Sequence, residues 1–123
     1  MATEADAHEL APKLRAEDAA EVFAHVGLAP LPALLESLRA SEHAYALIFD
    51  GKVAALWGVT SEGVVWLLGS ESIGRHPFAF ARLSRAAVAA LHEHFPTLSN
   101  YVDARCVTSI RWLRWLGFSV GEP

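Results

Sequence analysis

The chain has 123 residues, of which 53% are hydrophobic and 20% are charged, and its formal net charge at pH 7 is −4. This composition predicts one globular domain and excludes a disordered chain, and the acidic balance argues against non-specific nucleic-acid binding. The sequence has no uninterrupted apolar run near the ~20 residues that a membrane-spanning helix requires, so no span is expected.

The single cysteine and the first residues bear on where the protein resides. Cys106 has no second cysteine with which to form an internal disulfide, which fits a reducing compartment. Residues 1–13 have acidic residues before any base and no apolar run, so a signal peptide is not expected.

The N-terminal third is predicted to be mainly helical. A weak first strand is predicted at Ala7–Ala11. A helix follows within residues 15–28, where apolar residues recur at helical spacing and Gly27 marks the end. Pro30 and Pro32 then break the chain before a second helix. The residues of this second helix expected to face inward are Leu34, Leu35 and Leu38.

Three strands are predicted next. Residues 45–59 contain two apolar runs around Asp50-Gly51, a pair that favours a tight hairpin turn because both residues tolerate positive φ. A turn at residues 60–63 leads to a third strand at residues 64–70, which is apolar throughout and therefore expected to be central.

A long middle helix is expected between Pro77 and Pro96. Its predicted buried stripe consists of Phe80, Leu83, Ala87, Val88, Leu91 and Phe95. A strand at residues 98–104, a short helix with Gly117 at its C-cap and a final strand complete the chain. This order predicts a single α/β domain of three layers.

The end of the chain is similar to that of the GNAT N-acetyltransferase family. Members of that family have a strand, then Asn-x-x-Ala-Ile-x-Leu-Tyr-x-x-x-Gly-Phe, then a last strand. Ile110, Gly117 and Phe118 match this motif, whereas Cys106 stands where Asn is usual and Leu113 where Tyr is usual. The resemblance implies a GNAT-like domain over residues 1–123, with a mixed, mostly antiparallel sheet of five to seven strands.

A narrower resemblance rests on "NYV" at residues 100–102 followed by "SIRWLRWLGF" at residues 109–118. This pattern resembles the family of small phage proteins that includes internal virion protein A of short-tailed phages. It implies a virion component or assembly accessory protein with a catalytically degenerate GNAT-like fold, located in the bacterial host cytoplasm, in the virion or in both. The implied partners are other phage structural proteins. No cofactor is expected. The sequence does not decide whether the chain forms a homo-oligomer.

Two arginine-containing surfaces are candidates for docking. One combines Arg111, Arg114 and Trp115, a composition typical of the hot spots of protein interfaces. The other consists of Arg82 and Arg85, together with Arg75, on one side of the middle helix. Arginines that simply keep an exposed helix face soluble are the simpler interpretation of this second set.

The competing hypothesis is an acetyl-CoA-dependent N-acetyltransferase. In a GNAT enzyme, backbone N–H groups at a helix N-terminus hold the acyl-CoA pyrophosphate. The residues that would do so here are Ile73, Gly74, Arg75, His76 and Phe78. Glu71 would act as the general base, and Tyr101 would substitute for the missing acid at Leu113.

Several features of this turn favour a role without catalysis. Pro77 removes one N–H donor, and the Phe side chains crowd a backbone that must approach phosphate closely. No metal site is predicted either. His92 and His94 lie two positions apart, on different sides of a helix, where they cannot bind one ion together.

Overall fold

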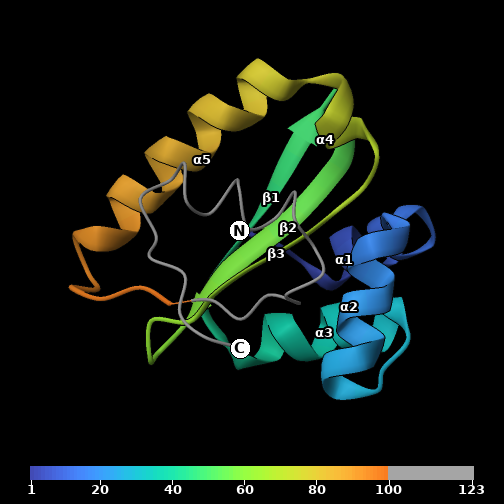
Figure 1. Cartoon of the computed structure of the whole chain (residues 1–123), viewed down its shortest axis with the longest axis horizontal. Helices are drawn as coiled ribbons and strands as arrows, with labels where there is room; N and C mark the ends of the chain where they lie inside the picture. The colour runs from blue at the N-terminus through green and yellow to red at the C-terminus, as the bar shows by residue number, and fades with distance from the viewer. Residues whose placement is uncertain (100–123) are drawn as a thin grey trace.

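The computed structural model describes residues 1–99. These residues form helices and an antiparallel sheet, and the chain runs between them through short turns (Figure 1). The elements are α1 (Glu4–Leu10), η1 (Ala11–Lys13), α2 (Ala16–Val26), α3 (Pro30–Ala40), β1 (Ser41–Phe49), β2 (Lys52–Thr60), β3 (Val65–Gly69), α4 (Ser72–Arg75) and α5 (Pro77–His92). The α/β class is confirmed.

The sheet is a meander in the order β1-β2-β3, with each neighbouring pair antiparallel. The predicted hairpin turn is confirmed, because Asp50 and Gly51 have φ of 54° and 74° and Phe49 pairs with Lys52. The register of the hairpin shifts at two places, between Ser41 and His43 and between Leu47 and Ile48. At the second place, Leu47 pairs with Ala55 but Ile48 pairs with Val53. This irregularity bulges β2 near its start, which increases the local twist of the hairpin.

The second edge of β3 is paired at both of its ends. Leu14 forms an antiparallel bridge with Ser70 beyond the C-terminal end of the strand, and Ser99 forms a parallel bridge with Val64 at the other end. The Val65 N–H donates to the Ser99 carbonyl at 2.7 Å. Within residues 1–99, β2 is nevertheless the central strand and β3 is an edge strand with two isolated bridges, so the prediction that the third strand is central is not confirmed there. The predicted strand at residues 98–104 lies mostly outside the described residues.

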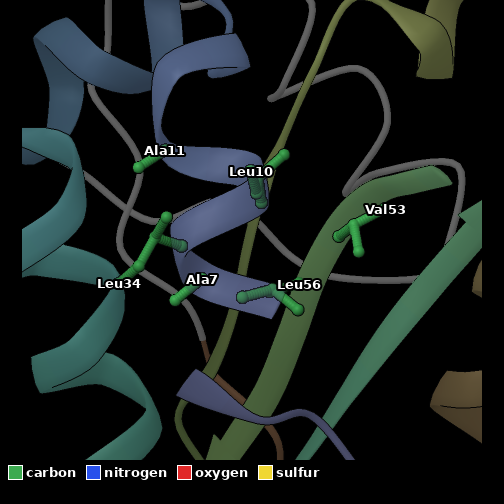
Figure 2. Close-up of a cluster of buried hydrophobic side chains, with 6 residues drawn as sticks. All are labelled: Ala7, Leu10, Ala11, Leu34, Val53 and Leu56. Carbon is green, nitrogen blue, oxygen red and sulfur yellow. The ribbon is translucent and has the colours of Figure 1, made fainter. Parts of the chain in front are cut away.

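The hydrophobic core lies between one face of the sheet and the N-terminal helices (Figure 2). Leu10 and Leu34 are fully buried and meet Leu56 of β2, which is also fully buried. Burying a side chain of this kind stabilises the fold by about 1.5–3 kcal/mol. The core cluster consists of Ala7, Leu10, Ala11, Leu34, Val53 and Leu56.

The prediction of a first strand at Ala7–Ala11 was wrong, because these residues lie in α1 and η1. Thr3 caps α1 by accepting a hydrogen bond from the Asp6 N–H, and the Asp6 carboxylate accepts one from the Thr3 N–H at 2.8 Å. This capping box satisfies two donors that a helix start otherwise leaves unpaired. Ala7, Leu10 and Ala11 then share one helical face toward the sheet.

The predicted end of α2 is confirmed, whereas α3 already includes Pro30 and Pro32, which were predicted to precede it. Gly27 has a φ of 72°, the left-handed conformation typical of a helix C-cap, and Pro30 opens α3. Leu34 is fully buried, whereas Leu35 and Leu38 are half-buried against the core. Phe23 departs from the expectation, since it is 66% exposed despite its place in the apolar pattern of α2.

Helix α5 lies on the opposite side of the β1–β2 hairpin from α1, α2 and α3 (Figure 1). Its predicted buried stripe is correct for Leu91 but wrong for Leu83, which is 45% exposed. Ser84 is buried in its place. The inward face therefore follows the spacing Phe80, Ser84, Ala87, Val88 and Leu91. None of the helices within residues 1–99 combines the length and the apolar character needed to cross a membrane.

Candidate functional site

The turn between β3 and α5 was predicted as the phosphate cradle of an acyltransferase. Glu71 is the N-cap residue of α4 and is exposed, and its side chain makes no capping hydrogen bond. Ile73 is buried and packs over Gly69, where an added Cβ would overlap the Ile73 Cδ1 atom. Ile73 therefore serves packing, while Gly74, Arg75 and Phe78 are exposed.

Most of the N–H groups of this turn donate to carbonyls within the turn. The Ile73 N–H donates to Ser70 at 3.2 Å, the Gly74 N–H to Glu71 at 3.0 Å, and the His76 N–H to Ile73 at 3.1 Å. Pro77 has no N–H, and no side chain caps α5. The donors left at the start of α5 are those that any helix start leaves without an intrahelical partner. An anion near them would gain about 0.3–1 kcal/mol.

His76 joins the turn to the tip of the β1–β2 hairpin. Its Nε2 atom lies 3.3 Å from the Asp50 carboxylate, and its ring lies 4.6 Å from the Phe49 ring, centroid to centroid. His76 is half-buried, whereas Asp50 is exposed. The sequence placed His76 in a phosphate cradle, but its side chain instead packs against β1 and fixes α4 to the hairpin.

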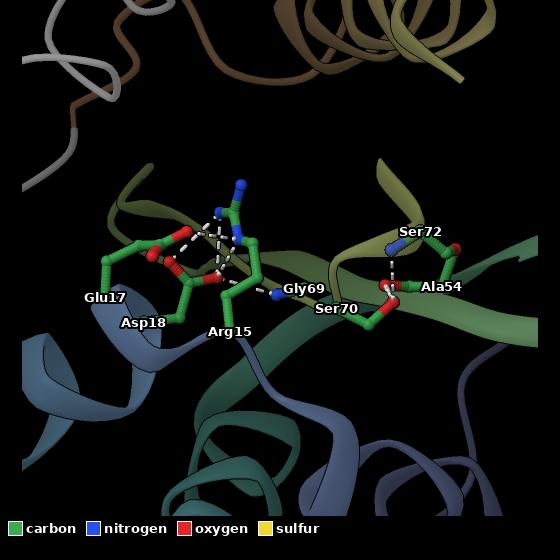
Figure 3. Close-up of polar contacts among 7 residues, drawn as sticks. All are labelled: Arg15, Glu17, Asp18, Ala54, Gly69, Ser70 and Ser72. Atoms are coloured by element: carbon green, nitrogen blue, oxygen red, sulfur yellow. Dashed lines mark hydrogen bonds and ion pairs between the residues drawn. The ribbon is translucent and has the colours of Figure 1, made fainter. Parts of the chain in front are cut away.

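A buried polar cluster that the sequence analysis missed lies at the C-terminal end of β3 (Figure 3). Asp18 is 3% exposed, and its Oδ2 atom accepts hydrogen bonds from the Gly69 N–H and from Arg15 Nη2, each at 2.8 Å. The backbone N–H of Arg15 donates to the Gly69 carbonyl at 2.8 Å. The N–H and the carbonyl of Gly69 are therefore both hydrogen-bonded to residues at the start of α2.

Burial raises the pKa of Asp18 above its ordinary value of 3.8. The positive charge of Arg15, the Gly69 N–H and the hydrogen bonds from Arg15 act in the opposite direction, while the negative charge of Glu17 adds to the rise. Desolvation outweighs the attraction because the carboxylate has almost no contact with water. The only local signal in the sequence was Arg15 three positions before Asp18 at the start of a predicted helix.

Two serines continue this cluster toward α4. The Ser70 hydroxyl donates to the Ala54 carbonyl at 3.0 Å and accepts a hydrogen bond from the Ser72 N–H at 3.3 Å (Figure 3). These bonds hold the chain where it leaves the sheet. The Ser70 hydroxyl is engaged on both sides, so the cluster is a structural support and not an activated nucleophile.

Helix α5 presents an exposed face of mixed character. Phe78 is 80% exposed, and Arg82 and Arg85 follow at one and two further turns. We use the name outer face of α5 for the exposed residues Phe78, Arg82, Arg85, Ala86, Ala89 and Glu93. The prediction that Arg82 and Arg85 share one helix side is confirmed, whereas Arg75 belongs to the separate helix α4.

The remaining predicted site residues cannot be placed against these features. Tyr101, Arg111, Arg114 and Trp115 lie outside the described residues. Within residues 1–99, His, Cys, Asp and Glu side chains form no group of three able to hold a metal ion. No family model, curated protein or solved structure matches the chain. The two family resemblances of its C-terminal motif therefore stay hypotheses.

Proposed function

We propose that this chain is a phage protein, virion-associated or an accessory of assembly, that acts by docking to another protein and not by catalysis. Two observations of different kinds support this function. The first is the resemblance of residues 100–118 to a family of small phage proteins. The second, which carries the proposal, is the outer face of α5.

The outer face of α5 has the composition of a docking surface. Phe78 exposes 80% of its large apolar side chain on this face, and Leu83, which lies beside the face, is 45% exposed. Arg82 and Arg85 lie between or beside them on the same helix. Arginines next to exposed aromatic and aliphatic groups are enriched where proteins bind one another, because guanidinium groups pair with carboxylates while the apolar groups lose contact with water.

The turn before α5 is a poor fit for the pyrophosphate of acetyl-CoA. Its donors at Ile73, Gly74 and His76 already donate to local carbonyls. Micromolar affinity requires about 8 kcal/mol, whereas a helix N-terminus supplies about 0.3–1 kcal/mol for an anion. An N-acetyltransferase stays the second candidate, because the parallel bridge between Val64 and Ser99 brings the start of the predicted strand at residues 98–104 beside β3, in line with the GNAT-like sheet of that hypothesis.

The docking proposal is tested by incorporation into particles. Phage carrying Arg82→Glu together with Arg85→Glu should yield particles with at least about tenfold less of this protein, which corresponds to ~1.4 kcal/mol of lost binding. The exposed Arg39 of α3 provides the matched control, since Arg39→Glu reverses an arginine away from α5. Quantitative mass spectrometry of purified particles gives the readout. Normal incorporation of the double variant contradicts docking through α5.

A separate measurement decides between docking and acetyl transfer. Isothermal titration of acetyl-CoA into the purified protein, at concentrations that detect high-micromolar binding, should give no heat beyond dilution. One-to-one binding that is lost with Gly74→Pro would instead support the enzyme, and Glu71→Gln would then test the general base. The incorporation experiment therefore tests docking, and the titration separately tests acetyl-CoA binding.

A further inference from the structure

We infer that the outer face of α5 pairs with the same face of a second copy of this chain, with the two helices antiparallel. The inference rests on the proposed function, since it names a partner for the surface proposed there to dock. It requires that the exposed residues of α5 complement themselves across a two-fold axis, as every isologous interface does.

The residues of the outer face form one continuous stripe. Successive residues of an α-helix are rotated by about 100°, because ~3.6 residues make one turn. Phe78, Arg82, Arg85, Ala86, Ala89 and Glu93 then lie within roughly a third of the helix circumference, opposite Ser84 and Leu91. All six are exposed, so α5 has one face packed inward and one face directed to solvent.

The charges along this stripe are separated by sign. The arginines lie in its N-terminal half, and Glu93 lies at the C-cap. Arg82 and Glu93 are three turns apart, about 16 Å along one helix, which is too far for a direct ion pair within one copy. In an antiparallel pair, Arg82 of each copy lies opposite Glu93 of the other. The symmetry therefore creates two Arg82–Glu93 ion pairs, neither of which can form within one helix.

Glu93 at the C-cap of α5 runs against the helix dipole, whereas His92 in the last turn agrees with it. Acidic groups stabilise a helix near its N-terminus and basic groups near its C-terminus, by about 0.3–1 kcal/mol each. The first turn of α5 has no acidic residue, and Glu93 occupies its C-cap. An antiparallel neighbour reverses this disadvantage, because it brings its negative helix end and its Glu93 beside the N-terminal arginines. The position of Glu93 is thus unfavourable in an isolated helix and favourable in a pair.

The middle of the stripe allows the two helices to approach closely. When Arg82 lies opposite Glu93, Ala86 lies opposite Ala89 near the two-fold axis. Small side chains there keep the backbones from being held apart. In the same register, Phe78 lies at the end of the stripe, opposite residue 97 of the second copy and beyond the end of its α5. One pair of short helices buries less than the ~1,200 Å² of a stable interface, so the dimer should be weak and sensitive to salt.

Sedimentation equilibrium of the full chain, over a wide concentration range at low and high salt, tests this pairing. The wild-type protein should show a reversible monomer–dimer equilibrium that weakens as salt is added. Arg82→Glu and Glu93→Arg should each weaken dimerisation by at least about tenfold, since each places like charges together twice. The double variant Arg82→Glu/Glu93→Arg should restore dimerisation, because both pairs form again with reversed sign.

The variants suit this test because each replaces a charge in the direction that the helix dipole favours. Arg82→Glu moves an acid toward the N-terminal half, and Glu93→Arg puts a base at the C-terminus. Loss of the dimer therefore does not follow from a weaker helix, and circular dichroism checks that helical content is kept. A wild-type chain that stays monomeric, or a double variant that stays monomeric while folded, overturns the inference.

The experiments can contradict self-pairing and docking to another phage protein independently of each other. A monomeric wild-type protein whose Arg82→Glu/Arg85→Glu variant is still lost from particles overturns self-pairing and leaves docking to another phage protein standing. A dimer restored by the charge swap, together with normal particle incorporation of Arg82→Glu/Arg85→Glu, supports self-pairing and contradicts docking through α5.

Discussion

Replacing Arg15 by alanine should destabilise the fold mainly at neutral pH. Asp18 is 3% exposed, and the Arg15 guanidinium donates to both of its carboxylate oxygens, at 3.0 Å and 2.8 Å. Without Arg15, the carboxylate keeps only the Gly69 N–H among its charge-stabilising partners in the described residues. Breaking a buried ion pair by removing one partner typically costs about 3–5 kcal/mol, so a loss in this range is expected at about pH 7.

The pH dependence of this loss follows from the direction in which burial shifts the pKa of Asp18. A carboxyl whose pKa is higher in the folded state binds its proton more tightly there, so its contribution to stability is present at low pH. That contribution is lost as the pH rises from 3.8, the ordinary value, through the raised pKa of the folded state. Removing the positive charge of Arg15 raises the pKa of Asp18 further, so Arg15→Ala should be least harmful in acid.

Urea unfolding of wild type and Arg15→Ala at about pH 4 and about pH 7 measures this difference. A second substitution, Asp18→Asn, should recover most of the loss at neutral pH, because a neutral amide oxygen still accepts from the Gly69 N–H. Arg39→Ala is the control, since its pair with Glu36 is exposed and contributes about 0–1 kcal/mol. An Arg15→Ala deficit that is equal at both pH values, or larger in acid, refutes the reasoning.

Three further substitutions test how the described part of the fold is held together, each measured by urea unfolding. Leu34→Ala should cost about 2–5 kcal/mol, since Leu34 is fully buried in the core; a loss under 1 kcal/mol would contradict that packing. Gly69→Ala should cost about 1–3 kcal/mol, because its Cβ overlaps the Ile73 side chain, and Gly69→Ala/Ile73→Val should be milder. Thr3→Ala should cost about 1 kcal/mol through loss of the cap of α1, with Thr3→Ser as the neutral control.

The sequence predicted those features that depend on neighbouring residues. Asp50-Gly51 specified the hairpin turn because few other pairs adopt positive φ at both positions. Gly27 ended α2 for the same conformational reason, and Pro77 opened α5 where its missing N–H removes no hydrogen bond. Each of these signals acts within one turn, so no knowledge of tertiary packing was required.

The errors arose where a distant segment decided the outcome. The role of Asp18 depends on Gly69, which lies 51 positions further along the chain. Nothing in the local sequence pattern indicated that Asp18, an acidic residue in the first turn of α2, would be buried against the end of β3. The error at Ala7–Ala11 had a local cause instead, because so short a stretch fits a strand as well as a helix and the capping box between Thr3 and Asp6 favours the helix.

On the inward side of α5, Ser84 is buried where Leu83 was predicted to be. This difference between prediction and structure matters most for the proposed function. Hydrophobicity alone placed Leu83 in the core and oriented the helix accordingly. The observed rotation exposes Leu83 and aligns Phe78, Arg82 and Glu93 along the solvent side. The core, the turn and the Asp18 cluster all have a role in folding. On the outer face of α5, by contrast, Phe78 is left in water and Glu93 at the C-cap opposes the helix dipole. The partner proposed above would remove Phe78 from water and place a positive charge beside Glu93.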